Sequence, residues 1–228
     1  DKLDIKSFPE LEQLMLHKIF DLNNSFENYF QNYDFHNLYK ELLNFCTVDL
    51  SAFYFDIRKD VLYCDPITSN KRKSCIALLN IILSVLSRWF APILSFTTEE
   101  IYQLIEKKNK SIHLEKFINI LKNFENKELY SKWNELIKIR DKCNISIEEK
   151  RISKEIGSSL EAEIEINLDT KLKDLTKNID FSELCITSKA NINFQESSEI
   201  TVITKKASGT KCPVCWKISV DPCSRHTG

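Results

Sequence analysis

The sequence predicts a mainly α-helical protein: an antiparallel helical bundle, then a small α/β subdomain and a short cysteine-rich tail. Apolar residues recur at three- and four-residue steps through most of residues 11–147, the period of amphipathic helices. One later segment, residues 160–168, alternates strictly between apolar and polar residues, as half-buried strands do. Three Gly in 228 residues are too few for Gly-rich phosphate loops or many tight hairpins.

Two helices are predicted in the first 45 residues. Ser7-Phe8-Pro9-Glu10 has the pattern of a capping box with Pro early in the helix. The apolar face behind it consists of Leu11, Leu14, Met15, Ile19, Leu22, Phe26 and Phe30. Asp34 is expected to cap a second helix, whose apolar face is Phe35, Leu38, Leu42 and Phe45.

Further helices complete a predicted bundle over residues 1–126. Residues 48–62 are rich in aromatic residues and are predicted helical. A very apolar helix is expected to open at Lys71-Arg72-Lys73 and to end or kink at Pro92. Thr97 with Glu100 predicts another capping box. Such helices with short connections indicate an antiparallel bundle.

Residues 127–207 are predicted to form a long helix and the α/β subdomain. The helix carries Leu129, Trp133, Leu136, Ile137, Arg140, Cys143 and Ile147. The alternating segment 160–168 is a strand with a carboxylate face toward solvent. Residues 183–187 and 200–204 are two further strand candidates, and residues 169–178 are a helix candidate between strands.

Residues 208–228 are predicted to form a zinc knuckle. Cys212 and Cys215, then Cys223 and His226, are two ligand pairs that are each separated by two residues. Such a spacing lets both side chains of a pair reach one metal ion, and Cys3His is a normal structural zinc set. A disulfide knuckle or a tail of free thiols is the competing interpretation. No signal peptide and no apolar run long enough to cross a membrane are found, so a reducing, cytoplasmic compartment without membrane contact is expected.

Composition and motifs exclude several function classes. The net charge is −1, which argues against an overall electrostatic grip on nucleic acid, although the residues from Lys205 onward are locally basic. The sequence contains no P-loop and no G-x-G-x-x-G motif. Its four His have no neighbouring residues that suggest a catalytic triad. The chain is therefore expected to be non-catalytic by itself.

Several segments, in order along the chain, resemble the C-terminal part of bacterial-type isoleucyl-tRNA synthetases. The longest is NFCTVDLSAFYFDIRKD at residues 44–60, followed by LYCD at 62–65. YDFH at 33–36, APILSFTTEEI at 91–101, IGSSLEA at 156–162 and GTKCPVCW at 209–216 also match. The family usually ends in two Cys-x-x-Cys pairs, whereas Cys223 and His226 stand here across a short loop.

This resemblance implies a helical anticodon-binding domain (1–126), a connecting α/β region (127–207) and a zinc-binding tail (208–228). It implies a parent enzyme that activates isoleucine with ATP, charges tRNA(Ile) and removes mischarged valine. ATP and Mg²⁺ would bind in catalytic domains that, with the editing domain, are missing from this chain. Because the chain begins at Asp1 rather than Met, it is expected to be a processed product or a piece of something longer. It is expected to be a monomer that binds tRNA(Ile) and its own missing domains.

Candidate RNA-binding residues lie in the tail and at helix ends of the bundle. Trp216 stands among Lys211, Lys217 and Arg225 and is suited to stacking on a base, because proteins read splayed anticodon loops by stacking and base-edge hydrogen bonds. A hydrophobic cover over the metal site is an equally open interpretation of Trp216. Arg58 and Lys59 are candidates for phosphate contacts, and a solvated helix face is the alternative for each. A zinc-stapled helical scaffold that binds another protein remains the alternative function.

Overall fold

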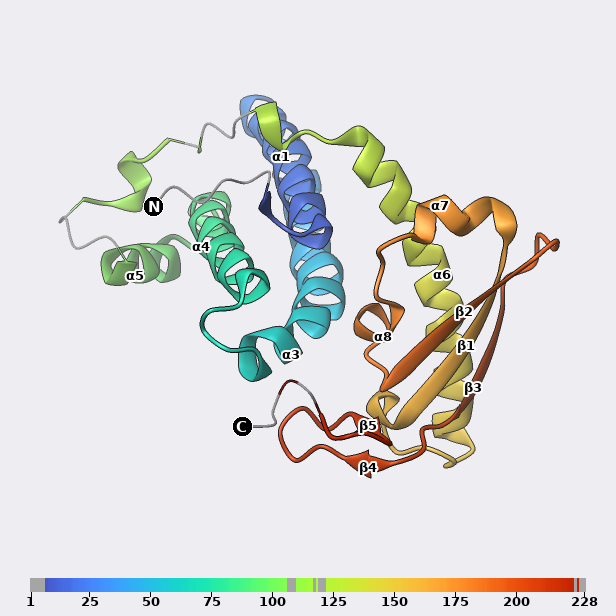
Figure 1. Ribbon diagram of the computed structural model, residues 1–228. Helices are drawn as coiled ribbons and strands as arrows, with labels where there is room; N and C mark the ends of the chain where they lie inside the picture. The colour runs from blue at the N-terminus through green and yellow to red at the C-terminus, as the bar shows by residue number, and fades with distance from the viewer. Residues whose placement is uncertain (1–6, 106–109, 117, 119–121, 224, 226–228) are drawn as a thin grey trace. The chain divides into compact units, whose positions relative to one another are not determined.

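The computed structural model describes residues 7–105, 110–116, 118, 122–223 and 225, and these residues are mainly helical, as predicted (Figure 1). The chain forms two compact units. The first contains residues 1–62 and 66–129, and the second contains residues 63–65 and 130–228. The tail belongs to the second unit.

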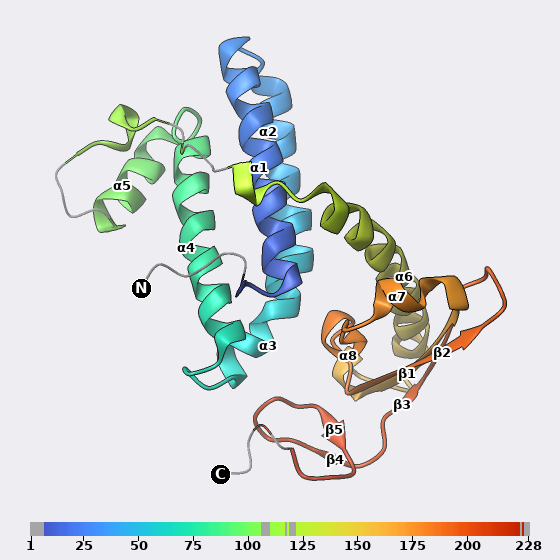
Figure 2. The ribbon, with the colours of Figure 1, turned by 45° about the horizontal axis from the view of Figure 1, so that its top comes forward.

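The first unit consists of helices, and Figure 2 shows α1 and α2 joined by a short connection. Its elements are α1 (Glu10–Gln31), α2 (Phe35–Asn44), the π-helix η2 (Phe45–Phe55), α3 (Asp56–Cys64), α4 (Asn70–Phe90), α5 (Ser95–Ile105) and the short 3₁₀ turns η3 (Ile112–Leu114) and η4 (Lys122–Phe124). The aromatic segment expected to be helical is η2 with α3, and α4 ends two residues before Pro92, as predicted.

An indole ring lies at the centre of the first unit's core. Trp89 of α4 packs edge-on against Phe26 of α1, with ring centroids 4.9 Å apart, and lies 6.0 Å from the ring of Phe45. All three rings are buried. The indole N–H donates to Asn23 Oδ1 at 3.1 Å, which satisfies its single donor. The apolar helix faces that the sequence predicted thus pack against one another in one core.

Helix α4 is also long and apolar enough, by length and composition, to cross a membrane. The expectation that no apolar run reaches that length was therefore wrong. One such helix is weak evidence of a membrane span, because core helices have the same composition. Here Cys75, Leu78, Ile82 and Val85 of α4 are buried in the core together with Trp89.

One predicted helix cap is wrong. Helix α1 begins at Glu10 with Pro9 at its N-cap position, so the capping box expected of Ser7 and Glu10 stays a prediction. Helix α5 begins at Ser95, so Thr97 lies inside the helix, and its neighbour Thr98 bonds back to the carbonyl of Leu94 at 3.0 Å. The predicted cap of Asp34 is confirmed, because its side chain accepts from the Asn37 N–H at 3.2 Å.

Arg58 forms a buried ion pair, which corrects its assignment as a phosphate contact. Its Nε and Nη2 donate to the two carboxylate oxygens of Glu12 at 2.6 and 2.8 Å. The Arg58 side chain is 4% exposed and that of Glu12 is 0% exposed. Tyr54 donates to the same carboxylate at 3.1 Å, and burial together with this carboxylate raises the Tyr54 pKa. A guanidinium held in this way is not available at the surface for RNA.

In the second unit the helix α6 packs along a three-stranded sheet, which Figure 1 shows at the right. The elements are α6 (Lys127–Ile152, whose first three residues belong to the first unit), η5 (Ser159–Glu161), β1 (Ala162–Asp169), η6 (Thr170–Leu172), α7 (Lys173–Thr176), α8 (Phe181–Leu184), β2 (Lys189–Gln195), β3 (Thr201–Lys206), β4 (Thr210–Lys211) and β5 (Ile218–Ser219). Ser146 of α6 bonds the Val202 carbonyl and Thr204 of β3, at 3.2 and 2.8 Å.

The alternating strand predicted at residues 160–168 is the central strand β1. The strand order is β2-β1-β3, with β2 parallel and β3 antiparallel to β1. Ala162, Ile164, Ile166 and Leu168 are buried, whereas the residues between them are half-buried. The carboxylates on that second face are paired with lysines of the neighbouring strands, since Glu163 lies 3.2 Å from Lys189 and Glu165 lies 2.8 Å from Lys205.

The strand predicted at residues 183–187 was wrong. Asp180 accepts hydrogen bonds from the N–H groups of Ser182 and Glu183 and so starts the short helix α8. Ile186 then has a φ of 56°, which no strand accommodates. The strand begins at Lys189 instead and pairs with β1. Strand β3 and the helical turns η6 and α7 agree with the predicted strand 200–204 and helix 169–178.

Replacing Arg58 by Met should lower the free energy of unfolding by about 3–5 kcal/mol, because the buried Glu12 carboxylate then has no counter-charge. Urea unfolding of the chain, followed by circular dichroism, measures this loss. Lys59→Met is the matched control, since Lys59 is exposed and its ion pair with Asp56 is solvated. Equal stabilities for the two variants would contradict the structural importance of the pair.

Candidate functional site

Three cysteine thiols converge in the tail of the second unit. The sulfur atoms of Cys212, Cys215 and Cys223 all lie within 4.8 Å of one another, and Cys215 and Cys223 are 3.8 Å apart. Tetrahedral Zn–S bonds of about 2.3 Å place two sulfurs about 3.8 Å apart. The cluster could therefore hold a metal ion, and its spacing fits zinc.

The backbone around the first pair forms a tight turn that aims both sulfurs at one point. The Trp216 N–H donates to the Cys212 carbonyl at 3.0 Å, and the Cys212 N–H donates to the Lys217 carbonyl at 2.9 Å. Trp216 has a φ of 64°, the left-handed conformation that such a turn requires. The Lys217 N–H also bonds the Cys215 sulfur. We name residues 210–223, the hairpin β4–β5 with its thiol cluster, the knuckle.

Gly209 is needed where the chain enters the knuckle. It has a φ of 124°, and a Cβ atom there would lie 2.1 Å from the carbonyl oxygen of Ser219. Any side chain at this position would push β4 and β5 apart, so a residue without one is required. Beyond Gly209, Thr210 pairs with Ser219, and Lys211 pairs with Ile218.

Without a bound cation the Cys215 thiol holds its proton at neutral pH. Burial, together with the neighbouring thiols of Cys212 and Cys223, raises the pKa of Cys215 to about 11. The Lys217 N–H opposes this shift by stabilising the thiolate. A divalent cation would reverse the balance, because metals bind the deprotonated sulfur.

The fourth expected ligand, His226, lies outside the described residues. The structure thus brings together three members of the predicted Cys3His set. A pocket of about 400 Å³ adjoins these thiols and is lined by residues from both strands of the hairpin and by Pro213, Val214 and Pro222.

Trp216 projects from the knuckle, and its side chain is 58% exposed. The ammonium group of Lys211 lies 5.3 Å from the centroid of the indole ring, within the range of a cation–π interaction. An exposed aromatic face beside a cation is suited to a planar, negatively charged ligand. This exposure favours a binding surface over a buried cover for the thiol cluster.

The other basic candidates occupy different environments. Lys217 is half-buried next to the cluster. Burial raises the pKa of the Asp180 carboxyl, but hydrogen bonds from Ser182 and Glu183 and the charge of Lys217 outweigh it and lower that pKa. Arg225 forms an ion pair with Asp65, and both residues belong to the second unit. Lys59 lies exposed in the first unit, 2.6 Å from Asp56.

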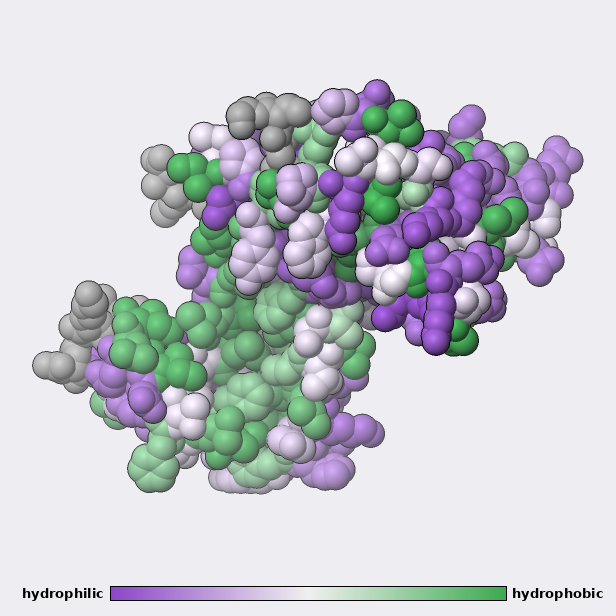
Figure 3. Space-filling view, turned by 90° about the horizontal axis from the view of Figure 1, so that it is seen from below, coloured by the Kyte–Doolittle hydropathy of each residue, from purple (hydrophilic) through white to green (hydrophobic). Residues whose placement is uncertain are grey.

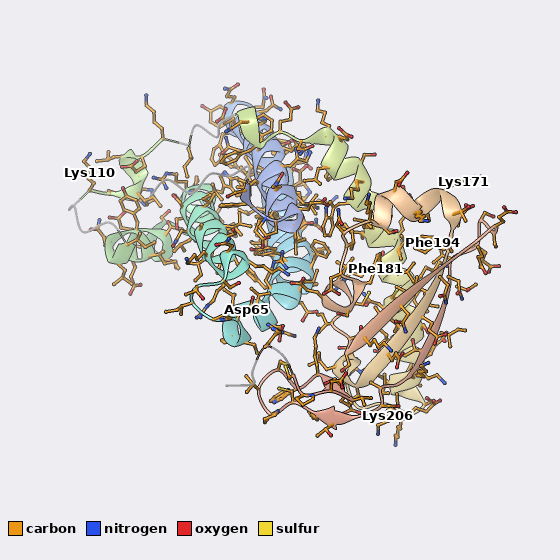
Figure 4. All side chains as sticks on the ribbon, viewed as in Figure 1. Asp65, Lys110, Lys171, Phe181, Phe194 and Lys206 are labelled. Carbon is orange, nitrogen blue, oxygen red and sulfur yellow. The ribbon has the colours of Figure 1, made fainter. Side chains whose placement is uncertain are left out.

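One residue near the knuckle, Ser188, was missed as a candidate in the sequence. Lys206, which was counted in the basic stretch and is labelled in Figure 4, is exposed at the end of β3, where the chain turns toward β4. Ser188 bonds the backbone of Ile218 in the hairpin. An isolated Ser in a loop carries no sequence signal, because its partners are backbone groups about 30 residues away. Lys205, which added to the basic character of the tail, is instead paired with Glu165.

Replacing Cys212 by Ser should reduce bound zinc from one ion per chain to almost none, because three thiolates can no longer converge. Elemental analysis of protein purified with zinc measures this. Cys46→Ser is the control, since Cys46 lies in η2 outside the cluster and its replacement should leave zinc unchanged. Full zinc retention by the Cys212 variant would exclude the cluster as the metal site.

Comparisons with known proteins show the family of this chain. Residues 12–166 match the family model described as the anticodon-binding domain of tRNA ligase. The isoleucine--tRNA ligase of Pelagibacter ubique is 63% identical over 227 residues, which cover 100% of this chain and 25% of that protein. The corresponding protein of Agrobacterium fabrum is 35% identical over 232 residues, covering 97% of this chain and 24% of its own length.

The chain therefore spans about a quarter of the length of the curated relatives it matches. The family match ends within β1, whereas the similarity to the first relative continues through the knuckle. The sequence similarity to that relative thus includes the residues of the helical unit, the sheet and the knuckle. By its match over most of its length, this chain belongs to the family of anticodon-binding domains of tRNA ligases.

Proposed function

We propose that this chain is the tRNA-binding part of an isoleucine--tRNA ligase and that its knuckle contacts the anticodon loop of tRNA(Ile). Membership of the anticodon-binding family supports an RNA partner. The observation that carries the assignment to the knuckle is the exposed indole of Trp216 beside the ammonium group of Lys211. Proteins recognise splayed single-stranded loops by stacking bases on such rings.

In this proposal Cys212, Cys215, Cys223 and His226 hold one structural zinc ion, which supplies folding free energy to a peptide too short to have its own core. The protein side chains then do the recognition. Trp216 stacks on a base, and Lys211 lies where it can neutralise a phosphate while packing against the same ring. Lys217, Arg225 and, in the helical unit, Lys59 supply further positive charge.

The whole protein would activate isoleucine with ATP and Mg²⁺, charge tRNA(Ile) and remove mischarged valine. Its parts outside this chain would carry that chemistry, since the present sequence has no nucleotide-binding motif. The role of this chain would be to hold the tRNA, as a monomer joined to those parts, in the cytoplasm. Similarity over the whole chain to isoleucine--tRNA ligases supports this reading.

A second candidate function, a zinc-stapled scaffold that binds another protein, is favoured by exposed apolar residues in the helical unit. Ile76 and Leu83 of α4 and Phe96 of α5 are 45%, 41% and 92% exposed. Figure 3 shows apolar residues gathered over this unit, whereas charged and polar residues dominate the view of the α/β unit. A scaffold would bind protein and remain indifferent to RNA, so tRNA binding separates the two functions.

Replacing Trp216 by Ala should weaken binding of an isoleucine tRNA transcript by about 5- to 150-fold, the value of one lost stacking interaction of about 1–3 kcal/mol. Fluorescence anisotropy with labelled tRNA at low salt measures the affinity. Trp216→Phe retains a ring and should restore most of the affinity. Two results together would contradict this role: the Ala variant loses its zinc, and the unaltered chain shows no preference for isoleucine tRNA. Trp216 would then be a cover for the metal.

Replacing Lys211 by Gln should make tRNA binding less dependent on salt, since one phosphate contact fewer releases about one counter-ion fewer. The slope of log K against log salt concentration should fall in magnitude by about 1. Lys171→Gln is the control, because Lys171 lies at the opposite end of the second unit from the knuckle (Figure 4). If both variants changed the slope equally, binding would be a diffuse charge effect.

A further inference from the structure

Ser188 connects three parts of the second unit through hydrogen bonds. It lies between α8 and β2, and its backbone N–H donates to the Ala162 carbonyl at 3.0 Å. Its hydroxyl group donates to the Leu160 carbonyl at 2.5 Å. The same oxygen accepts the backbone N–H of Ile218 at 2.6 Å. Ser188, directly before β2, thereby joins η5 and the start of β1 to the hairpin strand β5, and its side chain bonds both Leu160 and Ile218.

The Ile218 contact matters because of where this residue lies. Ile218 begins β5 and is two residues from Trp216. Strands β4 and β5 have two residues each, so the hairpin has little stiffness of its own. The Ile218 N–H bonds Ser188 and so fastens the knuckle to the sheet rather than to itself.

A bound metal cannot replace this contact. The thiols of Cys212, Cys215 and Cys223 all belong to the knuckle, so an ion held by them fixes only its internal geometry. The direction in which the knuckle presents its indole relative to the sheet depends on contacts outside the ligand set. On one side the chain is tethered through the Ala207 N–H, which donates to the Glu161 carbonyl at 2.8 Å. Ser188 supplies a second tether next to the other strand.

We propose that Ser188 is a positioning residue, which orients the knuckle so that Trp216 meets the anticodon loop. This role rests on the proposed function. The Ser188 hydroxyl touches no RNA and acts through the Ile218 amide. Its loss leaves the metal site intact and lets the indole sample directions that do not stack on a base, so that tRNA affinity falls.

The test uses the 228-residue chain loaded with zinc and carrying Ser188→Ala. A net loss of one hydrogen bond should weaken binding of the isoleucine tRNA transcript roughly fivefold. Zinc content should stay at one per chain, and hydrogen exchange at the Ile218 amide should accelerate. Ser188→Thr keeps the hydroxyl and should restore affinity. Ser146→Ala is the matched control, since it removes a hydroxyl that joins α6 to β3, away from the knuckle.

A double variant decides whether Ser188 acts through the indole. Ser188→Ala combined with Trp216→Ala should bind tRNA no more weakly than Trp216→Ala alone. Fully additive losses, or normal affinity of Ser188→Ala, would overturn the positioning role while leaving the proposed function intact. If the unaltered chain does not bind the transcript, the proposed function fails, and this role with it. If Ser188→Ala does not fold, Ser188→Cys is measured instead, because a thiol is similar in size to a hydroxyl group and forms only weak hydrogen bonds. The same results would then support or overturn the positioning role.

Discussion

The backbone hydrogen bonds that bring three thiols together are the constraint on which the proposed site in the knuckle depends. Residues 210–223 contain two strands of two residues each and bury little apolar surface. Such a segment cannot offset the conformational entropy of folding by burial alone. Its geometry instead follows from backbone hydrogen bonds that aim Cys212, Cys215 and Cys223 at one point. In the proposed function a zinc ion supplies the missing free energy, and the exposed Trp216 is held by that same turn.

Charged residues divide into those that hold the fold and those that remain at the surface. Arg58 is buried against Glu12 and links α3 to α1, so the Glu12 carboxylate neutralises its charge within the helical unit. Lys205 is paired with Glu165 across two strands. Lys211, by contrast, packs over an exposed ring, where its charge remains accessible to solvent. The chain is nearly neutral overall, and its proposed RNA contacts depend on a few such local groups.

The sequence predicted the elements whose pattern repeats over a full length. The alternation in residues 160–168 identified β1, and the three- and four-residue spacing identified α1, α4 and α6, because these periods reflect one buried face. Strand β2 was missed, since its alternation is weak and its position depends on pairing with β1. The wrong cap at Thr97 has a similar cause: a capping pattern matches a few residues, and where the helix begins depends on packing beyond them.

By itself, the sequence determined the helical class, the central strand and the cysteine spacing, because each depends on neighbours within a few residues. Tertiary structure decided which charges are buried, which aromatic ring is exposed and which distant groups meet. Arg58 and Lys59 are adjacent in sequence and alike in charge, yet one is buried against Glu12 and the other is exposed. Ser188 gains its partners from Leu160 and Ile218, about 30 residues away on either side. Such contacts follow from the packing of whole elements, which no local pattern encodes.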